Sequence, residues 1–89
     1  MKVKLELFGA SRDLSDNDFL EFNIEKKISI KDFKKKIINY VDEKFKGNEN
    51  YKKIIETSAF CSEDNNIISE NYKITKDQKI GIIPPIGGG

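Results

Sequence analysis

The sequence predicts a single α+β domain in which one main helix crosses a mixed β-sheet. Three observations support this class: two N-terminal segments alternate apolar and polar residues, one long segment repeats apolar residues at helical spacing, and short apolar runs between polar turns follow. The chain has 89 residues, of which 37% are hydrophobic and 35% are charged. Such a chain builds one small core under a heavily solvated surface, so we do not expect a deep, water-free catalytic cavity.

Two strands are expected near the N-terminus. The segment 3–7 alternates strictly, so its three apolar side chains share one face, and the segment 20–24 repeats this pattern. Gly9 breaks the first strand, and the polar segment 14–18 suits a hairpin connection to the second strand.

The main helix is expected to begin after Ser29, which with Asp32 resembles a capping box. Apolar residues then recur every three or four positions and define one buried stripe: Ile30, Phe33, Ile37, Val41 and Phe45. Gly47 is expected to end this helix, and a weaker helical pattern follows over residues 49–56.

Short strands are expected to complete the sheet at residues 58–62, 67–68 and 79–83. Two strands, a long helix and then further strands describe a β-grasp, or ubiquitin-like, sheet. In that topology the first and last strands are parallel neighbours. The alternative is a generic α+β sandwich with a different strand order.

Some apolar residues are expected on the outer face of this sheet, away from the helix. If Leu7 faces the helix, then Phe8 points outward, and if Ile82 faces inward, then Ile83 points outward. Phe8 and Ile83 would then form one exposed apolar patch, which Ile67 would extend from an adjoining strand. Such a patch is a candidate surface for binding another protein. The alternative is that a bulge or strand end turns Phe8 back into the core.

The composition excludes several kinds of site. The formal net charge is +1, so nothing predicts the concentrated basic face that nucleic acid requires. The chain has one cysteine, Cys61, and no histidine, which excludes an internal disulfide, a four-thiolate metal site and a Cys-His or Ser-His pair. We expect Cys61 to be a buried, inert thiol, whereas the alternative is an independent nucleophile or persulfide carrier. No apolar run is long enough to span a bilayer and no signal peptide is visible, so we expect a reduced, cytoplasmic protein without a bound cofactor or metal.

Residues 84–89 are expected to form an extended tail beyond a domain of residues 1–83. Pro84 and Pro85 lack the N–H groups that would continue a strand, and consecutive prolines favour a stiff, extended backbone. The remaining residues are Ile86, Gly87, Gly88 and Gly89. Six extended residues reach ~20 Å, and glycine lacks the side chain that would obstruct a narrow channel. The tail therefore suits presentation of a carboxylate to another protein's active site, whereas the alternative is a frayed terminus.

A terminal carboxylate is ionised at neutral pH, with a reference pKa of ~3.5, and is a poor electrophile. Its activation would need ATP to form an acyl-adenylate. The chain has no P-loop and no dinucleotide-binding fingerprint, so we expect a separate protein to use the ATP.

Two segments resemble the MoaD/ThiS family of sulfur carriers, specifically its molybdopterin synthase small subunits. The segment 8–14 is similar to the family's aromatic-then-Arg-acid-Leu stretch after the first strand. The segment 82–89 is similar to its ending, in which a strand is followed by Pro-Pro, an apolar residue, a small residue and Gly-Gly. The order of the expected elements agrees over the whole length, and the resemblance implies a β-grasp fold.

The resemblance also implies a function. Gly89 would be adenylated by an E1-like enzyme and converted to a thiocarboxylate with sulfur from a separate donor. The tail, ending in Gly88 and Gly89, would enter the active site of a large synthase subunit. There it would donate sulfur to cyclic pyranopterin monophosphate in molybdenum cofactor biosynthesis. The chain would be a non-catalytic, sulfur-donating subunit in a complex of two small and two large subunits.

The family's partner-binding positions fall on residues of this chain that the resemblance matches. Arg12 would pair with an acidic group of a partner, unless it is an ordinary surface arginine. The remaining positions belong to the expected patch and tail: Phe8, Ile67, Ile83, Pro84, Pro85, Ile86 and Gly87.

Three alternatives remain open at this point. The first is the same sulfur chemistry with another acceptor, in thiamin synthesis or tRNA thiolation, although the thiamin-type tail usually lacks the Pro-Pro step. The second is a ubiquitin-like modifier that is joined through Gly89 to lysines. The third is a binding module in which the tail has no chemical role.

Overall fold

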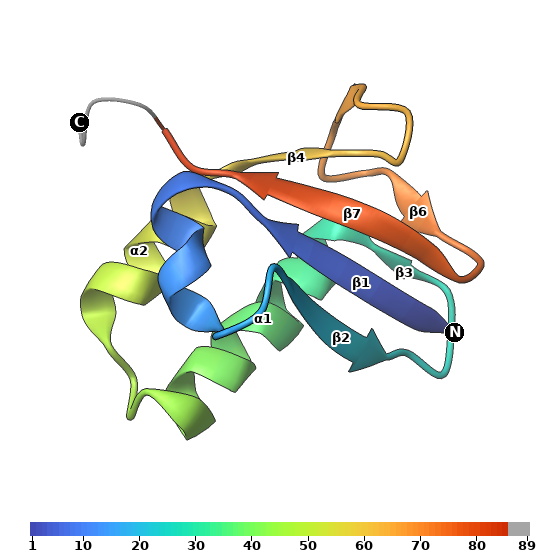
Figure 1. Cartoon of the computed structure of the whole chain (residues 1–89). Helices are drawn as coiled ribbons and strands as arrows, with labels where there is room; N and C mark the ends of the chain where they lie inside the picture. Colours follow the sequence, from blue (N-terminus) through green and yellow to red (C-terminus); the bar gives the residue numbers. More distant parts are fainter. Residues whose placement is uncertain (86–89) are drawn as a thin grey trace.

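A computed structural model describes residues 1–85, and its larger sheet has five strands in the order β2-β1-β7-β4-β5 (Figure 1). These strands are β1 Lys2–Leu7, β2 Phe19–Asn23, β4 Ala59–Cys61, β5 Ile67–Ile68 and β7 Gln78–Ile83. β1 and β7 are parallel, with Leu5 opposite Ile80, whereas the other pairs are antiparallel. The expected parallel pairing of the first and last strands is confirmed, and the topology is that of a β-grasp sheet.

The main helix, α1, spans Ile30–Lys44 and lies across one face of the sheet (Figure 1). The Ser29 side chain caps it by accepting a hydrogen bond of 3.2 Å from the Asp32 N–H. At its other end Gly47 has a φ of +72°, and the Gly47 N–H donates to the Val41 carbonyl at 3.4 Å. The expected start is therefore confirmed, whereas the helix ends at Lys44 with Phe45 as its C-cap, two residues before the predicted Gly47.

The core lies between α1 and the inner face of the sheet. The predicted helical stripe supplies Phe33, Ile37 and Val41, each without exposed area. Side chains from every second position of β1 and β7 meet them, which is the consequence of strand alternation. A second helix, α2 Glu49–Thr57, adds the fully buried Ile55.

Three short elements were not predicted. A 3-10 helix, η1 Gly9–Leu14, occupies the first part of the connection between β1 and β2. Leu14 was expected in a polar connection, but it is 1% exposed and belongs to the core. The strands β3 Ile28–Ser29 and β6 Lys73–Ile74 form a separate two-stranded sheet. Elements this short contain too few residues to show a periodicity.

Within residues 1–85, no helix combines the length and the apolar character needed to cross a bilayer.

Candidate functional site

An apolar patch occupies part of the outer face of the sheet, opposite α1. Gly81 lies opposite Glu6 of β1 and opposite Cys61 of β4, and Cys61 lies opposite Ile67. Paired residues of neighbouring strands share a face, so small and apolar residues follow one another across the sheet. We define the apolar patch by six residues: Phe8, Ala59, Cys61, Ile67, Gly81 and Ile83.

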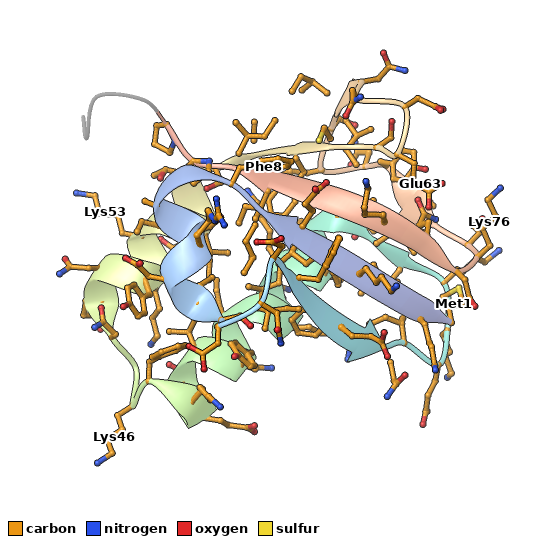
Figure 2. All side chains as sticks on the ribbon, viewed as in Figure 1. Met1, Phe8, Lys46, Lys53, Glu63 and Lys76 are labelled. Carbon is orange, nitrogen blue, oxygen red and sulfur yellow. The ribbon has the colours of Figure 1, made fainter. Side chains whose placement is uncertain are left out.

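Three members of the apolar patch, Phe8, Ile67 and Ile83, are the residues expected on the outer face. Phe8 is 40% exposed and Ile67 is 66% exposed, whereas Ile83 is half-buried. Phe8 does not turn back into the core, so that alternative is wrong (Figure 2 labels this side chain). The role of these residues in binding a partner remains a prediction.

Gly81 lies at the centre of the apolar patch. A Cβ atom at this position would lie 2.6 Å from Cys61 Sγ and 3.0 Å from Phe8 Cε2. The Phe8 ring therefore reaches over Gly81 of β7, and the Cys61 side chain approaches Gly81 from the neighbouring strand β4. Sequence reasoning missed the importance of Gly81, although glycine inside a strand is a known sign of close approach. Cys61 is 6% exposed, as expected for a buried thiol.

The rest of the outer face is charged. The Lys79 ammonium lies 3.3 Å from a Glu6 carboxylate oxygen. The Lys4 ammonium lies 5.8 Å from the ring centroid of Phe19, which is 39% exposed. The apolar patch is thus confined to the end of the sheet at which β7 finishes.

Arg12 lies on η1 and is highly exposed. Arg12 Nη2 and Asp18 Oδ1 are 3.0 Å apart, with side-chain exposures of 65% and 69%. An exposed pair of this kind contributes at most about 1 kcal/mol, so a stronger acidic partner would displace Asp18 at little cost. The proposed pairing of Arg12 with another protein remains a prediction.

The chain leaves the sheet beside η1. Pro84 is buried and Pro85 is exposed. Gly9 has a φ of +54°, and a Cβ atom on Gly9 would lie 3.9 Å from Cδ and Cγ of Pro84. A groove of 280 Å³ lies beside the two prolines, between η1 and α2. Its lining residues are Ala10, Asn50, Lys53, Ile54, Thr57, Pro84 and Pro85. The predicted tail residues Ile86, Gly87, Gly88 and Gly89 lie outside the described residues.

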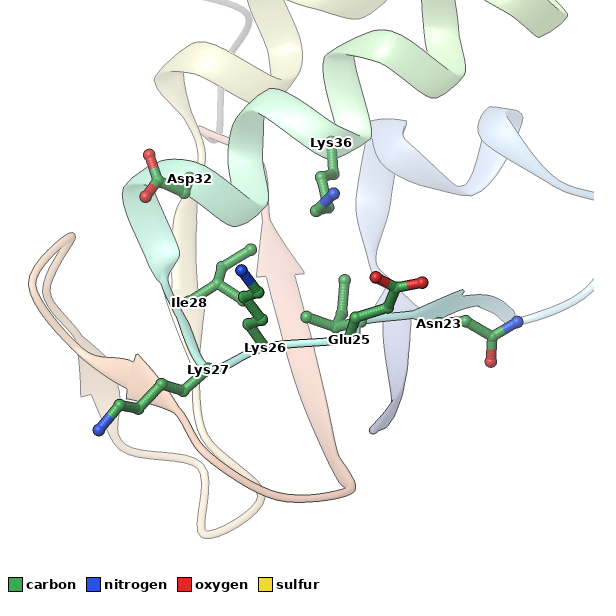
Figure 3. Close-up of a pocket in the computed structure, with 8 residues that line it drawn as sticks. Asn23, Glu25, Lys26, Lys27, Ile28, Asp32 and Lys36 are labelled. Carbon is green, nitrogen blue, oxygen red and sulfur yellow. The ribbon is translucent and has the colours of Figure 1, made fainter.

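A larger hollow, of 460 Å³, lies near the connection between β2 and β3 (Figure 3). Ile24 in its wall donates a hydrogen bond to the Met1 carbonyl, so the hollow lies at the opposite end of the sheet from Pro84. Lysines and carboxylates line it: Glu25, Lys26, Lys27, Asp32 and Lys36. In the described part of the chain, no three Cys, Asp or Glu side chains converge as metal ligands would.

Comparison with known proteins identifies the fold. No protein-family model matches the chain, and no curated protein matches it. A solved structure from Pyrococcus furiosus, provisionally named molybdopterin converting factor, subunit 1, is similar with a TM-score of 0.68 and 21% identity, over 96% of this chain and 98% of that chain. SAMP1 from Haloferax volcanii is similar with a TM-score of 0.68 and 9% identity, over the whole of both chains (100% each). At these identities the likeness shows a shared β-grasp fold.

Proposed function

We propose that this chain is a sulfur carrier of the MoaD/ThiS type and acts as the small subunit of molybdopterin synthase. In this proposal the Gly89 carboxylate attacks the α-phosphate of ATP on an E1-like enzyme, which forms an acyl-adenylate and releases pyrophosphate. A sulfur donor then replaces AMP and leaves a thiocarboxylate on Gly89. A large subunit would receive the tail and pass the sulfur to cyclic pyranopterin monophosphate.

One observation carries the proposal: the apolar patch and the start of the tail lie at the same end of one strand. Ile83 belongs to the patch, and Pro84 follows it directly. A protein that binds the patch would therefore also hold the base of the segment that ends in Gly89. A candidate partner-binding surface therefore lies at the base of the Pro-Pro-Ile-Gly-Gly-Gly ending. A frayed terminus without a function would not require such a surface.

The comparisons support the same proposal at the level of fold. The Pyrococcus furiosus protein carries a name that assigns it to molybdopterin conversion, and it shares the β-grasp fold over nearly its whole length. The name "subunit 1" implies a second subunit for that protein. By extension we propose a large subunit as the partner of this chain, in a complex of two small and two large subunits.

Intact mass spectrometry tests the carrier chemistry. The intact mass of the protein isolated from its own cells is measured first, to establish that Gly89 is its terminal residue. Incubation with ATP, an E1-like enzyme and a sulfur donor should then add the mass difference between sulfur and oxygen. A variant lacking Gly88 and Gly89 is the matched control and should gain nothing. If an enzyme that activates a known carrier leaves the full chain unchanged, the proposal is wrong.

The final acceptor needs a separate experiment. The thiocarboxylated chain, mixed with a large synthase subunit and cyclic pyranopterin monophosphate, should yield molybdopterin and return the carboxylate form. Isopeptide adducts on lysines, formed with ATP and without a sulfur donor, would instead identify a protein modifier. Sulfur transfer to a thiazole or tRNA acceptor alone would identify the related carriers.

A further inference from the structure

We propose that Ser11 is a positioning residue that holds the apolar patch and the start of the tail in one fixed arrangement. The geometric part of this proposal is independent of the chemistry, whereas its kinetic part rests on the proposed function. Ser11 makes no contact with a reacting atom and acts through Phe8, Gly9 and Pro84.

The Ser11 hydroxyl closes the turn in which β1 becomes η1. It donates a hydrogen bond of 2.6 Å to the Phe8 carbonyl and accepts one of 3.0 Å from the Phe8 N–H. Ser11 is 0% exposed, so its hydroxyl depends on these protein partners for its hydrogen bonds. The Ser11 side chain is therefore the partner of the Phe8 N–H, and it shares the Phe8 carbonyl with the Ser11 N–H, which donates to it at 3.2 Å. These bonds close the turn with Phe8 at φ −120° and ψ 151°.

Two neighbouring residues in this turn serve different parts of the candidate site. The Phe8 side chain reaches over Gly81 and forms part of the apolar patch. The Gly9 backbone, with its φ of +54°, lies beside the Pro84 ring. A change in the turn would consequently move the patch and the support of the tail relative to each other.

The far end of η1 is also fixed. Leu14 is 1% exposed in the core, and its carbonyl accepts a hydrogen bond of 3.0 Å from Tyr40 Oη on α1. Ala10 shares the groove beside Pro84 with Ile54 of α2. Pro84 is therefore buried beside η1, with α2 on the far side of the groove, before any partner binds.

This arrangement limits where the carboxylate can go. Four residues follow Pro85, and four residues span at most about 14 Å. A partner that docks on the apolar patch would find the terminal group within that distance of a fixed point. Because Pro84 is already buried against the domain, binding would not have to offset the conformational entropy of fixing that residue.

The kinetic test uses the carrier as the substrate of its E1-like enzyme. A variant that is only partly folded lowers the concentration of usable substrate, which raises the apparent KM and leaves kcat unchanged. A misdirected tail instead lowers kcat at saturating carrier, because docking no longer delivers the carboxylate to the ATP. We expect Ser11→Ala to lower kcat by about 10- to 100-fold, the usual result of misplacing a reacting group.

Ser29→Ala is the matched control. It also removes a hydroxyl that bonds to backbone, but at the first turn of α1, and it should leave kcat within about twofold of wild type. Pro84→Ala is a second test in case Ser11→Ala does not fold, since it removes only the ring beside Gly9. It should lower kcat without changing the backbone hydrogen bonds of the turn.

Proton NMR provides a readout that does not depend on activity. The Phe8 ring lies over Gly81, so ring-current shifts of the Gly81 α-protons report its position. These shifts should shrink in Ser11→Ala and remain in Ser29→Ala and Pro84→Ala. Unchanged Gly81 shifts in folded Ser11→Ala would overturn the proposal, as would an unchanged kcat in either Ser11→Ala or Pro84→Ala. Lack of activation of the wild type would refute the proposed function and leave the NMR test valid.

Discussion

Gly81 allows the apolar patch to exist, because Cys61 of β4 and Phe8, which follows β1, both approach β7 at this position. The patch is continuous only because Phe8 and Cys61 fill the space that a side chain at this position would occupy. Most glycines in strands weaken the sheet, whereas here the missing side chain permits close packing.

We predict that Gly81→Ala destabilises the protein by about 1–3 kcal/mol, the usual cost of forcing a methyl group into a packed site. The clash with Cys61 Sγ, at 2.6 Å, is the main cause. Urea denaturation measures the loss as a lower midpoint with an unchanged slope. The double variant that adds Cys61→Ala should recover part of the lost stability. If Gly81→Ala alone is as stable as wild type, the predicted clash with Cys61 is wrong.

Two phenylalanines on the outer face provide a comparison of binding. Phe8 and Phe19 are 40% and 39% exposed, but Phe8 belongs to the apolar patch and Phe19 lies under Lys4 in the charged region. We predict that Phe8→Ala raises the KM for activation by an E1-like enzyme about 10-fold or more, as for an interface hot spot. Phe19→Ala should change it less than about threefold, with both measured by steady-state kinetics. Equal effects would show that the partner does not distinguish the two regions.

Among the secondary-structure elements, α1 reaches several neighbours at once through one lysine, Lys34. Lys34 Nζ lies 3.0 Å from Glu70 Oε1 in the segment after β5 and 3.4 Å from the Glu56 carbonyl at the end of α2. It also lies 5.5 Å from the centroid of Phe60 on β4. The hydrogen bond from Lys34, with its positive charge as the next cause, lowers the pKa of Glu70 below its ordinary value of 4.5.

A lowered pKa in the folded state means that ionised Glu70 stabilises the fold at pH values above 4.5. This contribution is lost as the pH falls through the lowered value. We predict that Glu70→Gln is less stable than wild type at pH 7 and that the difference disappears at acidic pH. Denaturation at several pH values measures it. Glu43→Gln is the control, because Glu43 is exposed on α1 and pairs with no cation among residues 1–85. A constant difference between Glu70→Gln and wild type would contradict the linkage.

The predictability of these elements depended on their length. The spacing of apolar residues identified α1, and Ser29 gave its start because capping depends on local residue types. The end was predicted at Gly47, whereas the cap is Phe45 and Gly47 lies in the turn after it. η1 and the small sheet of β3 and β6 were missed, because six and two residues are too few for a pattern. Ser11 carries no sequence signal of its burial, which depends on the close return of the chain to Phe8.

At the level of the whole molecule, alternation predicted the outward direction of Phe8 and Ile83, and the assumption that the first and last strands are neighbours brought them into one patch. It did not predict that Cys61 completes the patch, because the pairing of β4 with β7 is a tertiary contact between distant segments. Nor did it predict that Pro84 is buried, because that depends on η1 and α2. The sequence thus indicated the topology and the exposed residues, whereas the packing between them required the structure.

The parallel pairing of β1 and β7 has a mechanical consequence. The chain enters β1 at Lys2 at one end of the sheet and leaves β7 at Ile83 at the other end (Figure 1). A force that pulls the two chain ends apart therefore acts along both strands and loads their hydrogen bonds together, in shear. A hairpin pulled from its open end breaks its bonds one at a time. Tension between the start of β1 and the end of β7 must consequently break these hydrogen bonds together, so the pairing that positions the base of the tail is also the part of the sheet that best resists such a force.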